Sequence, residues 1–355
     1  MTTPTDPFPR PGWITLRSRR PAGSCRRDRR AMTIIPLLLV ALLLALVIST
    51  SQGEYDIPML DVMRAAVGLE TGNPNHALVV RDFRLPRILV ALLIGAALGV
   101  SGDIIQGVTR NDLADPGLLG VNAGAGVLVV GYLTLVAAPD TTLLPWLALA
   151  GGLGAAAIIY GLTRRGGASP VRLILLGVGL ASLGAALINY FITRLEVDSA
   201  QRAFVWLTGS VYGSTWADVR LLLVWAGLLI PAAMLMSRQL NAMALGDAAA
   251  VGLGVRVEPY RAVLLAAAAG LAAITVTAAG TIAFVGLVAP HLARRLVGPA
   301  HEALLPAAAL TGGLLLVVAD LAARTVIAPT ELPIGVTTAL IGAPFFAWLL
   351  YKRGK

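Results

Sequence analysis

No lysine precedes Lys352 in this 355-residue chain, so nearly all of its 28 basic residues are arginines. A glycine-rich phosphate loop of the GxxxxGK[ST] type needs a lysine to reach the β- and γ-phosphates of a nucleotide. The sequence therefore excludes such a loop. If ATP drives this protein, the ATP must be hydrolysed by a partner subunit.

Cysteine and histidine are also scarce. The chain has one cysteine, Cys25, and three widely spaced histidines, His76, His291 and His301. A single cysteine excludes an internal disulfide, and the histidine spacing fits no metal-binding motif. We expect no metal or other cofactor bound by this chain, and the sequence shows no set of paired acids typical of an intramembrane enzyme.

Charged residues make up only 13% of the chain, against 57% hydrophobic residues. A soluble domain carries about 25% charged residues. A soluble fold of this composition would leave much apolar surface in water, whereas a helix bundle can turn that surface toward lipid. We therefore predict an all-α polytopic membrane protein.

Arginines crowd the first 32 residues, which end at a second methionine, Met32. We interpret residues 1–32 as a cytoplasmic tail that is either disordered or upstream of a true start at Met32, and residues 33–355 as a single transmembrane domain. The apolar run 33–50 is long for the core of a signal peptide and has no convincing cleavage site after it. It is predicted to be an uncleaved first span.

Crossing about 30 Å of hydrocarbon takes roughly 20 helical residues. Runs of about this length predict ten spans. The stretch 262–293 is too long for one span, and Gly280, Gly286 and Pro290 offer places to break it. The predicted spans are 33–50, 88–107, 117–138, 143–162, 171–192, 219–236, 262–280, 282–297, 303–319 and 333–351.

Breaking that stretch places Arg261, Arg294, Arg295 and Lys352 on the same side as the arginine-rich tail. Positively charged segments favour the cytoplasmic side of a membrane. We therefore expect a protein of the cell (inner or plasma) membrane with both termini in the cytoplasm.

One cytoplasmic segment, residues 237–261, lies between the sixth and seventh predicted spans. Its centre is an alanine-rich helix former between Gly246 and Gly252. A short helix flanked by glycines suits a rigid contact for a partner protein, and it equally suits a solvated connector.

Several motifs together resemble the FecCD/BtuC permeases, the membrane subunits of type II ABC importers for ferric siderophores, haem and cobalamin. The similarity runs from about residue 55 to the end of the chain and includes segment 237–261, which looks like the coupling segment of that family. The other motifs are RLPRILVALLIGAALGVSG at 84–102, LADPGLLGVNAGAG at 113–126, GTIAFVGLVAPHLARRLVG at 280–298, ELPIGV at 331–336 and GAPFF at 342–346.

This resemblance implies a BtuC-like fold and a permease subunit, not an enzyme, that imports its solute by alternating access. It implies two ABC ATPase subunits that use ATP, a solute-binding protein on the outer face, and a second permease copy in a homodimer or a paralogue; no nucleic acid is expected. A ferric siderophore is the expected solute, with haem and cobalamin as alternatives. A proton-coupled secondary transporter that uses Asp103 is the alternative class.

The resemblance also assigns residues to the two faces. Arginines matching Arg84, Arg87 and Arg324 receive acidic residues of the binding protein in the resembling transporters, so these three form the predicted docking site. Without the resemblance, Arg84 and Arg87 would be interpreted as snorkelling cations or as partners of Asp82. The residues predicted to contact the ATPase are Ala244, Leu245, Gly246, Asp247 and Gly252.

Asp103 is the only acid well inside a predicted span, and an intramembrane carboxylate is a functional candidate, as a pathway residue or a proton relay. The favoured interpretation is that it reaches water near the cytoplasmic end and pairs with Arg110. Asp103 and Asp112 depart from the family, which has a small or apolar residue and a proline at these positions. Further pathway or gate candidates are Gln106, Asn111 and, in the segment GGASPVRL, Ser169, whereas His291 is expected to have a structural partner.

Overall fold

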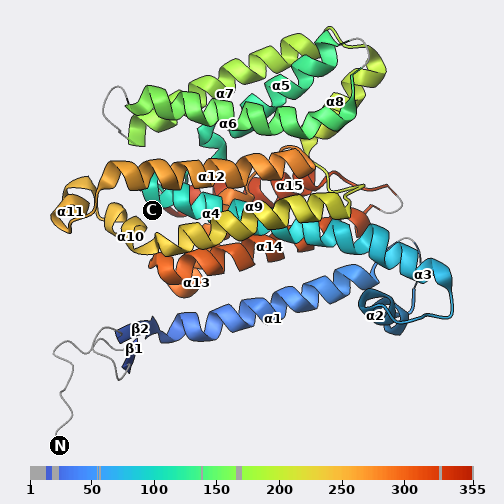
Figure 1. The fold of residues 1–355 in the computed structure, drawn as a ribbon, viewed down its shortest axis with the longest axis horizontal. Coiled ribbons are helices and arrows are strands. Elements are labelled where there is room, and N and C mark those ends of the chain that lie inside the picture. The colour runs from blue at the N-terminus through green and yellow to red at the C-terminus, as the bar shows by residue number, and fades with distance from the viewer. Residues whose placement is uncertain are drawn as a thin grey trace, which may run out of the picture.

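The computed structural model describes residues 13–17, 24–53, 55, 57–136, 139–164, 170–327 and 330–353. Long helices lie side by side along one common direction, and a small antiparallel ladder precedes them (Figure 1). The ladder pairs β1 (Trp13–Arg17) with β2 (Ser24–Asp28), inside the segment predicted to be a tail. The first helix begins directly after β2.

Ten long helices correspond one to one to the ten predicted spans. In the part of the chain that the structure describes, seven helical segments are long and apolar enough to cross a membrane, α5 and α15 are shorter apolar helices, and α13 is shorter still. The ten helices are α1 (Arg29–Ser51), α4 (Leu85–Thr109), α5 (Val121–Leu135), α6 (Leu144–Arg164), α7 (Pro170–Ile192), α9 (Trp216–Leu235), α12 (Val257–Ala279), α13 (Val285–Val297), α14 (His301–Thr325) and α15 (Ile334–Arg353).

The break predicted within residues 262–293 is confirmed. Helix α12 ends at Ala279, and the next residue, Gly280, has φ 71° and ψ −161°, a conformation that glycine adopts at little cost. Helix α13 then begins at Val285, and Pro290 lies inside α13 instead of ending it.

Short elements connect the long helices, and the sequence predicted only one of them. That one is α11 (Asp247–Gly252), which falls between the two flanking glycines as expected. Helix α3 and the π-helix η1 run directly into α4. The other short elements are α2 (Met59–Val67), α3 (Pro74–Leu78), η1 (Val79–Arg84), η2 (Pro116–Leu119), η3 (Thr141–Leu143), α8 (Val197–Thr208) and α10 (Ser237–Ala244).

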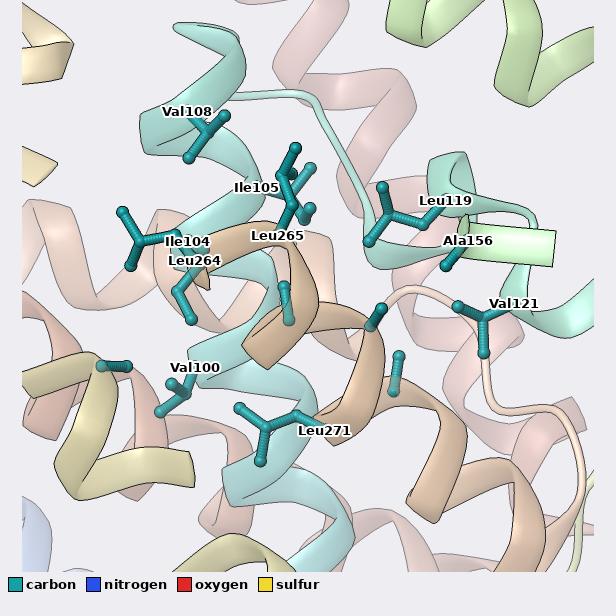
Figure 2. Packing of buried hydrophobic residues seen from close by; sticks show 14 of the residues in the cluster. Val100, Ile104, Ile105, Val108, Leu119, Val121, Ala156, Leu264, Leu265 and Leu271 are labelled. Atoms are coloured by element: carbon teal, nitrogen blue, oxygen red, sulfur yellow. The ribbon is translucent and has the colours of Figure 1, made fainter. Parts of the chain in front are cut away.

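Burial separates an inner group of helices from an outer one. In their most apolar stretches, 78% of the residues of the α4 segment and of α12 are buried, against 11% in α1 and 17% in α7. Figure 2 shows Val100 and Ile104 of α4 packed beside Leu264 and Leu271 of α12. The α4 and α12 helices therefore form the centre of the bundle, and the exposed apolar faces of α1 and α7 suit lipid or another subunit.

Glycines allow the central helices to touch backbone to backbone, as is common in membrane bundles. A Cβ atom added at Gly102 of α4 would collide with the backbone carbonyl of Gly286 of α13. A Cβ added at Gly95 would collide with the carbonyl of Gly312 of α14 in the same way. Helix α4 is thus in direct contact with α13 and α14 at two levels.

We expect Gly102→Val to lower the stability of the protein, because the backbone of α13 cannot move aside as a flexible side chain could. Overpacking of this kind costs about 1–3 kcal/mol. The matched control is Gly227→Val in the middle of α9, where no atom lies within 4 Å of an added Cβ. Thermal unfolding in detergent should show a lower midpoint for Gly102→Val alone; equal midpoints for the two variants would contradict the close contact.

Candidate functional site

The three arginines predicted to dock a binding protein lie at one end of the bundle. Arg84 is only 6% exposed and donates from Nη1 to the carbonyls of Thr50 and Ser51 and from Nη2 to the carbonyl of Tyr55. The carbonyls of Thr50 and Ser51 end α1, where backbone acceptors have no partner within the helix. Arg84 therefore joins the end of α1 to the start of α4, and its docking role stays a prediction.

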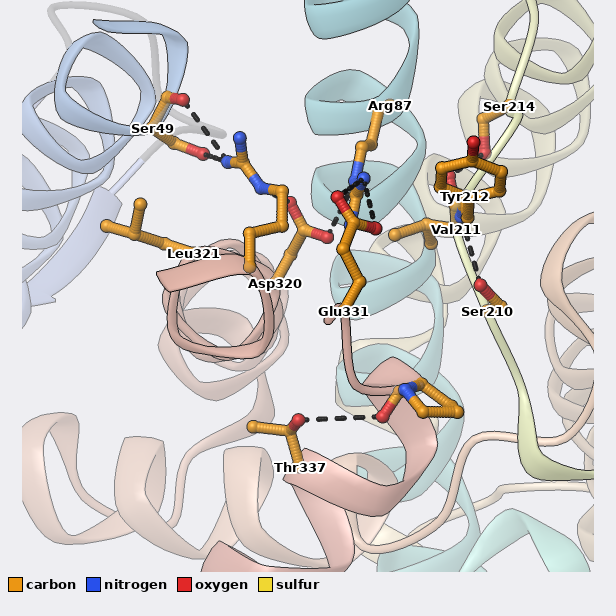
Figure 3. A network of polar contacts seen from close by, with 12 residues as sticks. Ser49, Arg87, Ser210, Val211, Tyr212, Ser214, Asp320, Leu321, Glu331 and Thr337 are labelled. Carbon is orange, nitrogen blue, oxygen red and sulfur yellow. Dashed lines mark hydrogen bonds and ion pairs between the residues drawn. The ribbon is translucent and has the colours of Figure 1, made fainter. Parts of the chain in front are cut away.

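Arg87 and Arg324 belong to an ion-pair network with two acids. Figure 3 shows Arg87, Asp320 and Glu331 of this network. Arg87 Nε lies 2.9 Å from Asp320 Oδ1, and its Nη1 lies 2.9 Å from Glu331 Oε2. Arg324 Nε lies 3.1 Å from Asp320 Oδ2, and its Nη2 donates to Ser49 Oγ at 2.7 Å. The Asp320 carboxylate, 1% exposed, is thus shared by two arginines from different helices.

The network contains two cations and two carboxylates and is neutral as a unit. Glu331 lies on the connection from α14 to α15, and its side chain is 27% exposed, whereas the side chain of Arg87 is 13% exposed. A carboxylate of a second protein would therefore reach Arg87 only by sharing it with Glu331 or displacing Glu331. The geometry makes Glu331 a competitor for the predicted docking cation.

The opposite end of the bundle carries the predicted coupling segment, where α11 protrudes beyond the end of α12 and α10 lies beside the ends of the long helices (Figure 1). Helix α10 ends at Ala244, and Gly246 precedes α11 with φ 108° and ψ 154°. Leu245, Val251 and Leu253 are 70%, 63% and 65% exposed. Clustered exposed apolar side chains of this kind mark contact surfaces for other proteins.

Ion pairs anchor the coupling segment to the central helices. Both carboxylate oxygens of Asp247 lie 2.8 Å from Arg261 Nη2 of α12, and Oδ1 lies 3.8 Å from Arg110 Nη2 at the end of α4. Arg261 also pairs with Glu258 at 2.8 Å. A displacement of α11 would therefore act on α4 and α12, the centre of the bundle. Contact with an ATPase stays a prediction for Ala244, Leu245, Gly246, Asp247 and Gly252.

Asp103 is fully buried, and the interpretation that it reaches water and pairs with Arg110 was wrong. Its Oδ2 lies 2.9 Å from His301 Nδ1 of α14, and its Oδ1 lies 3.5 Å from Arg294 Nη2 of α13. Helices α13 and α14 cover this face of α4, so the carboxylate is enclosed. Arg110 lies beyond the end of α4 and contacts Asp247 instead.

Gln106 and Asn111 make hydrogen bonds with backbone groups. Gln106, 1% exposed, donates from Nε2 to the carbonyls of Ala114 and Leu287 at 3.3 and 3.4 Å. Asn111 Oδ1 accepts from the N–H of Leu113 at 3.0 Å, which forms a side-chain turn. Their pathway roles stay predictions, and Ser169 lies outside the described residues.

Asp112, the second position that departs from the resemblance, forms an ion pair with a residue of α13. Arg294 Nη1 donates to Asp112 Oδ1. This ion pair restrains the turn after α4, where a proline ring would restrain it in the resembling permeases. Arg294 therefore contacts both Asp103 and Asp112. The sequence gives no sign that Arg294, His301 and Glu331 are site residues, because their ion-pair partners lie between 182 and 244 residues away in the chain.

The histidines lie apart, and over the ranges described no three metal-ligating side chains converge. His291 is buried and packs edge-on against Phe345 of α15 at 5.8 Å between ring centroids, so it has the structural neighbour that was expected. His76 Nδ1 lies 3.5 Å from Asp61 Oδ2 at the arginine-network end.

Comparison with known proteins identifies the family suggested by the sequence motifs, and the match covers nearly the whole chain. The model of the FecCD transport family matches residues 39–352. The iron(3+)-hydroxamate import system permease protein FhuG of Bacillus subtilis is 42% identical over 333 residues, which cover 92% of this chain and 98% of the relative. The Fe(3+) dicitrate transport system permease protein FecD of Escherichia coli is 44% identical over 278 residues, covering 78% and 86%.

Solved structures agree with the fold. An inward-facing metal-chelate type ABC transporter superposes with a TM-score of 0.81 at 31% identity and covers 90% of this chain and 99% of its own. PsaBC from Streptococcus pneumoniae, at 19% identity and a TM-score of 0.52, covers 76% and 92% and shares the fold alone. The predicted BtuC-like permease architecture is confirmed, and the chain belongs to the FecCD transport family.

Proposed function

We propose that this chain is the membrane-spanning permease subunit of an ATP-driven importer, and that it carries a ferric siderophore from a solute-binding protein to the cytoplasm by alternating access. The observation that supports this most strongly is the match of residues 39–352 to the family. Its relatives include FhuG, named for iron(3+)-hydroxamate import, and YfhA of Bacillus subtilis, named a probable siderophore permease, each covering more than 90% of this chain.

The proposed assembly places a partner on each face. The end with Arg84, Arg87 and Arg324 faces the binding protein, and the end with α10 and α11 faces two ATPase subunits that hydrolyse ATP, while this chain binds no cofactor itself. A second permease copy, or a paralogue, completes the membrane part. The protein lies in the cell membrane with both termini in the cytoplasm, as the basic residues near Arg294 and Lys352 favour.

A proton-coupled carrier built on Asp103 fits the observations less well. The family match favours ATP-driven import. Moreover, both oxygens of the buried Asp103 carboxylate face donors of the chain itself, His301 and Arg294. A titrating transport residue needs access to both sides of the membrane in turn.

The test is uptake of radioactive iron into proteoliposomes that hold the chain with its ATPase and are supplied with binding protein. We expect uptake only with ATP inside and with a siderophore-loaded binding protein. Hydroxamate, catecholate, citrate and haem loads labelled with radioactive iron, and in parallel a cobalamin load labelled with radioactive cobalt, identify the solute. Uptake by the chain alone in a pH gradient, without any ATPase bound, would contradict the proposal.

A further inference from the structure

The first turn of α14 is capped by a side chain from the coupling segment. Asn241 of α10 accepts a hydrogen bond from the backbone N–H of His301 at 2.9 Å and donates to Glu302 Oε2 at 2.6 Å. Ala300, the residue before α14, has no side chain that could do this. Because the first N–H groups of a helix lack partners within it, Asn241 supplies the cap from another helix. Helices α10 and α14 are therefore tied together.

The same histidine continues the connection into the bundle. The His301 imidazole, with its side chain 3% exposed, meets the fully buried carboxylate of Asp103 in α4 at 2.9 Å. The second oxygen of Asp103 faces Arg294 of α13, which also holds Asp112 in the turn after α4. One carboxylate thus contacts α13 through one oxygen and α14 through the other.

Helix α4 packs closely against α10 and the start of α14 beside this ion pair. A Cβ atom added at Gly107, one turn after Asp103, would lie 2.8 Å from Leu240 Cδ1 of α10 and 3.1 Å from His301 Cε1. Leu240 is fully buried. Helix α10 is therefore seated directly on α4 beside the Asp103 carboxylate, so a shift of α10 must move α4 or break these contacts.

We propose that Asp103 is a positioning residue for coupled transport: with His301 and Asn241 it transmits movement of the coupling segment to α4, α13 and α14. This rests on the proposed function, since the movement comes from the ATPase. A buried carboxylate that loses a partner is strongly destabilised, so the helices it joins favour moving as one unit.

The experiment measures solute imported per ATP hydrolysed in the reconstituted complex. Asp103→Asn keeps the side-chain shape but removes the charge, and His301→Gln keeps a polar side chain but removes the imidazole that contacts Asp103. We expect each to lower the ratio at least tenfold while the ATPase rate of the assembled complex stays within twofold. The matched controls are Asp61→Asn and His76→Gln, which alter an aspartate–histidine contact of 3.5 Å at the other end of the bundle. They should leave the ratio unchanged.

Two further variants keep the outcome decisive if Asp103→Asn does not assemble. Asn241→Ala leaves the buried pair intact but removes the cap, and it should lower the ratio as well. The double variant Asp103→Asn/His301→Gln should be no worse than the poorer single one, because both interrupt one connection. An unchanged ratio, or equal losses of uptake and ATP hydrolysis, would overturn the proposal. Absence of ATP-dependent uptake by the wild-type complex would instead refute the proposed function, and the inference with it.

Discussion

Gly246→Val should lower coupled uptake at least fivefold while the chain still folds and binds its ATPase. Gly246 has φ 108°, in a region that glycine adopts readily and a β-branched residue does not, and an added Cβ would lie 3.3 Å from Arg110 Nη1. Strain of this type costs about 1–3 kcal/mol. Strain of this size at Gly246 lowers the population of the conformation in which α11 is placed as in the wild-type protein by roughly 5- to 150-fold.

The measurement for Gly246→Val is uptake against ATP hydrolysis in the same vesicles. We expect uptake to fall at least fivefold with the basal ATPase rate retained. Gly213→Val is the matched control, because Gly213 also has a positive φ, 73°, but lies in the turn before α9 with no atom within 4 Å of an added Cβ. Coupling equal to wild type in Gly246→Val, or an equal loss in the control, would show that the conformation of this glycine does not matter for coupling.

Much of the fold could be predicted because its signals are local. The ten long helices follow from apolar runs, and Gly280 and Gly246 mark places where the backbone leaves the helical region. The short helices were missed, except α11. Helix α10 is amphipathic and only eight residues long, so its sequence alone does not distinguish it from a loop.

The polar contacts were harder to predict, because they join residues that are distant in the chain. The resemblance identified Arg87 and Arg324 but gave no sign that Asp320 and Glu331 already pair with them. The interpretation of Asp103 failed for a similar reason. Its position near the end of the helix suggested access to water. The residues that contact it, Arg294 of α13 and His301 of α14, lie 191 and 198 residues later in the chain.

Arg87→Glu should abolish docking of the binding protein and also destabilise the permease, because it would place a third carboxylate beside Asp320 and Glu331. Breaking a buried ion pair by altering one partner costs about 3–5 kcal/mol. Loss of uptake in this variant alone therefore cannot separate docking from folding. Arg64→Glu is the matched control: it makes the same change of charge on exposed α2, where the only ion pair of Arg64 with a described residue is a 3.9 Å contact to Asp61.

The double variant Arg87→Glu/Glu331→Arg separates the two effects. Exchanging the charges restores an internal ion pair between the same two positions, so the thermal midpoint in detergent should recover much of its loss. The arginine would then lie at position 331, on the connection before α15, instead of on α4. A binding protein whose acids fit Arg87 would still fail to dock. We expect binding, measured by surface plasmon resonance at low and high salt, to stay at least tenfold weaker than wild type. If the exchange restores binding and uptake together, Arg87 serves the internal network alone, and docking depends on other residues.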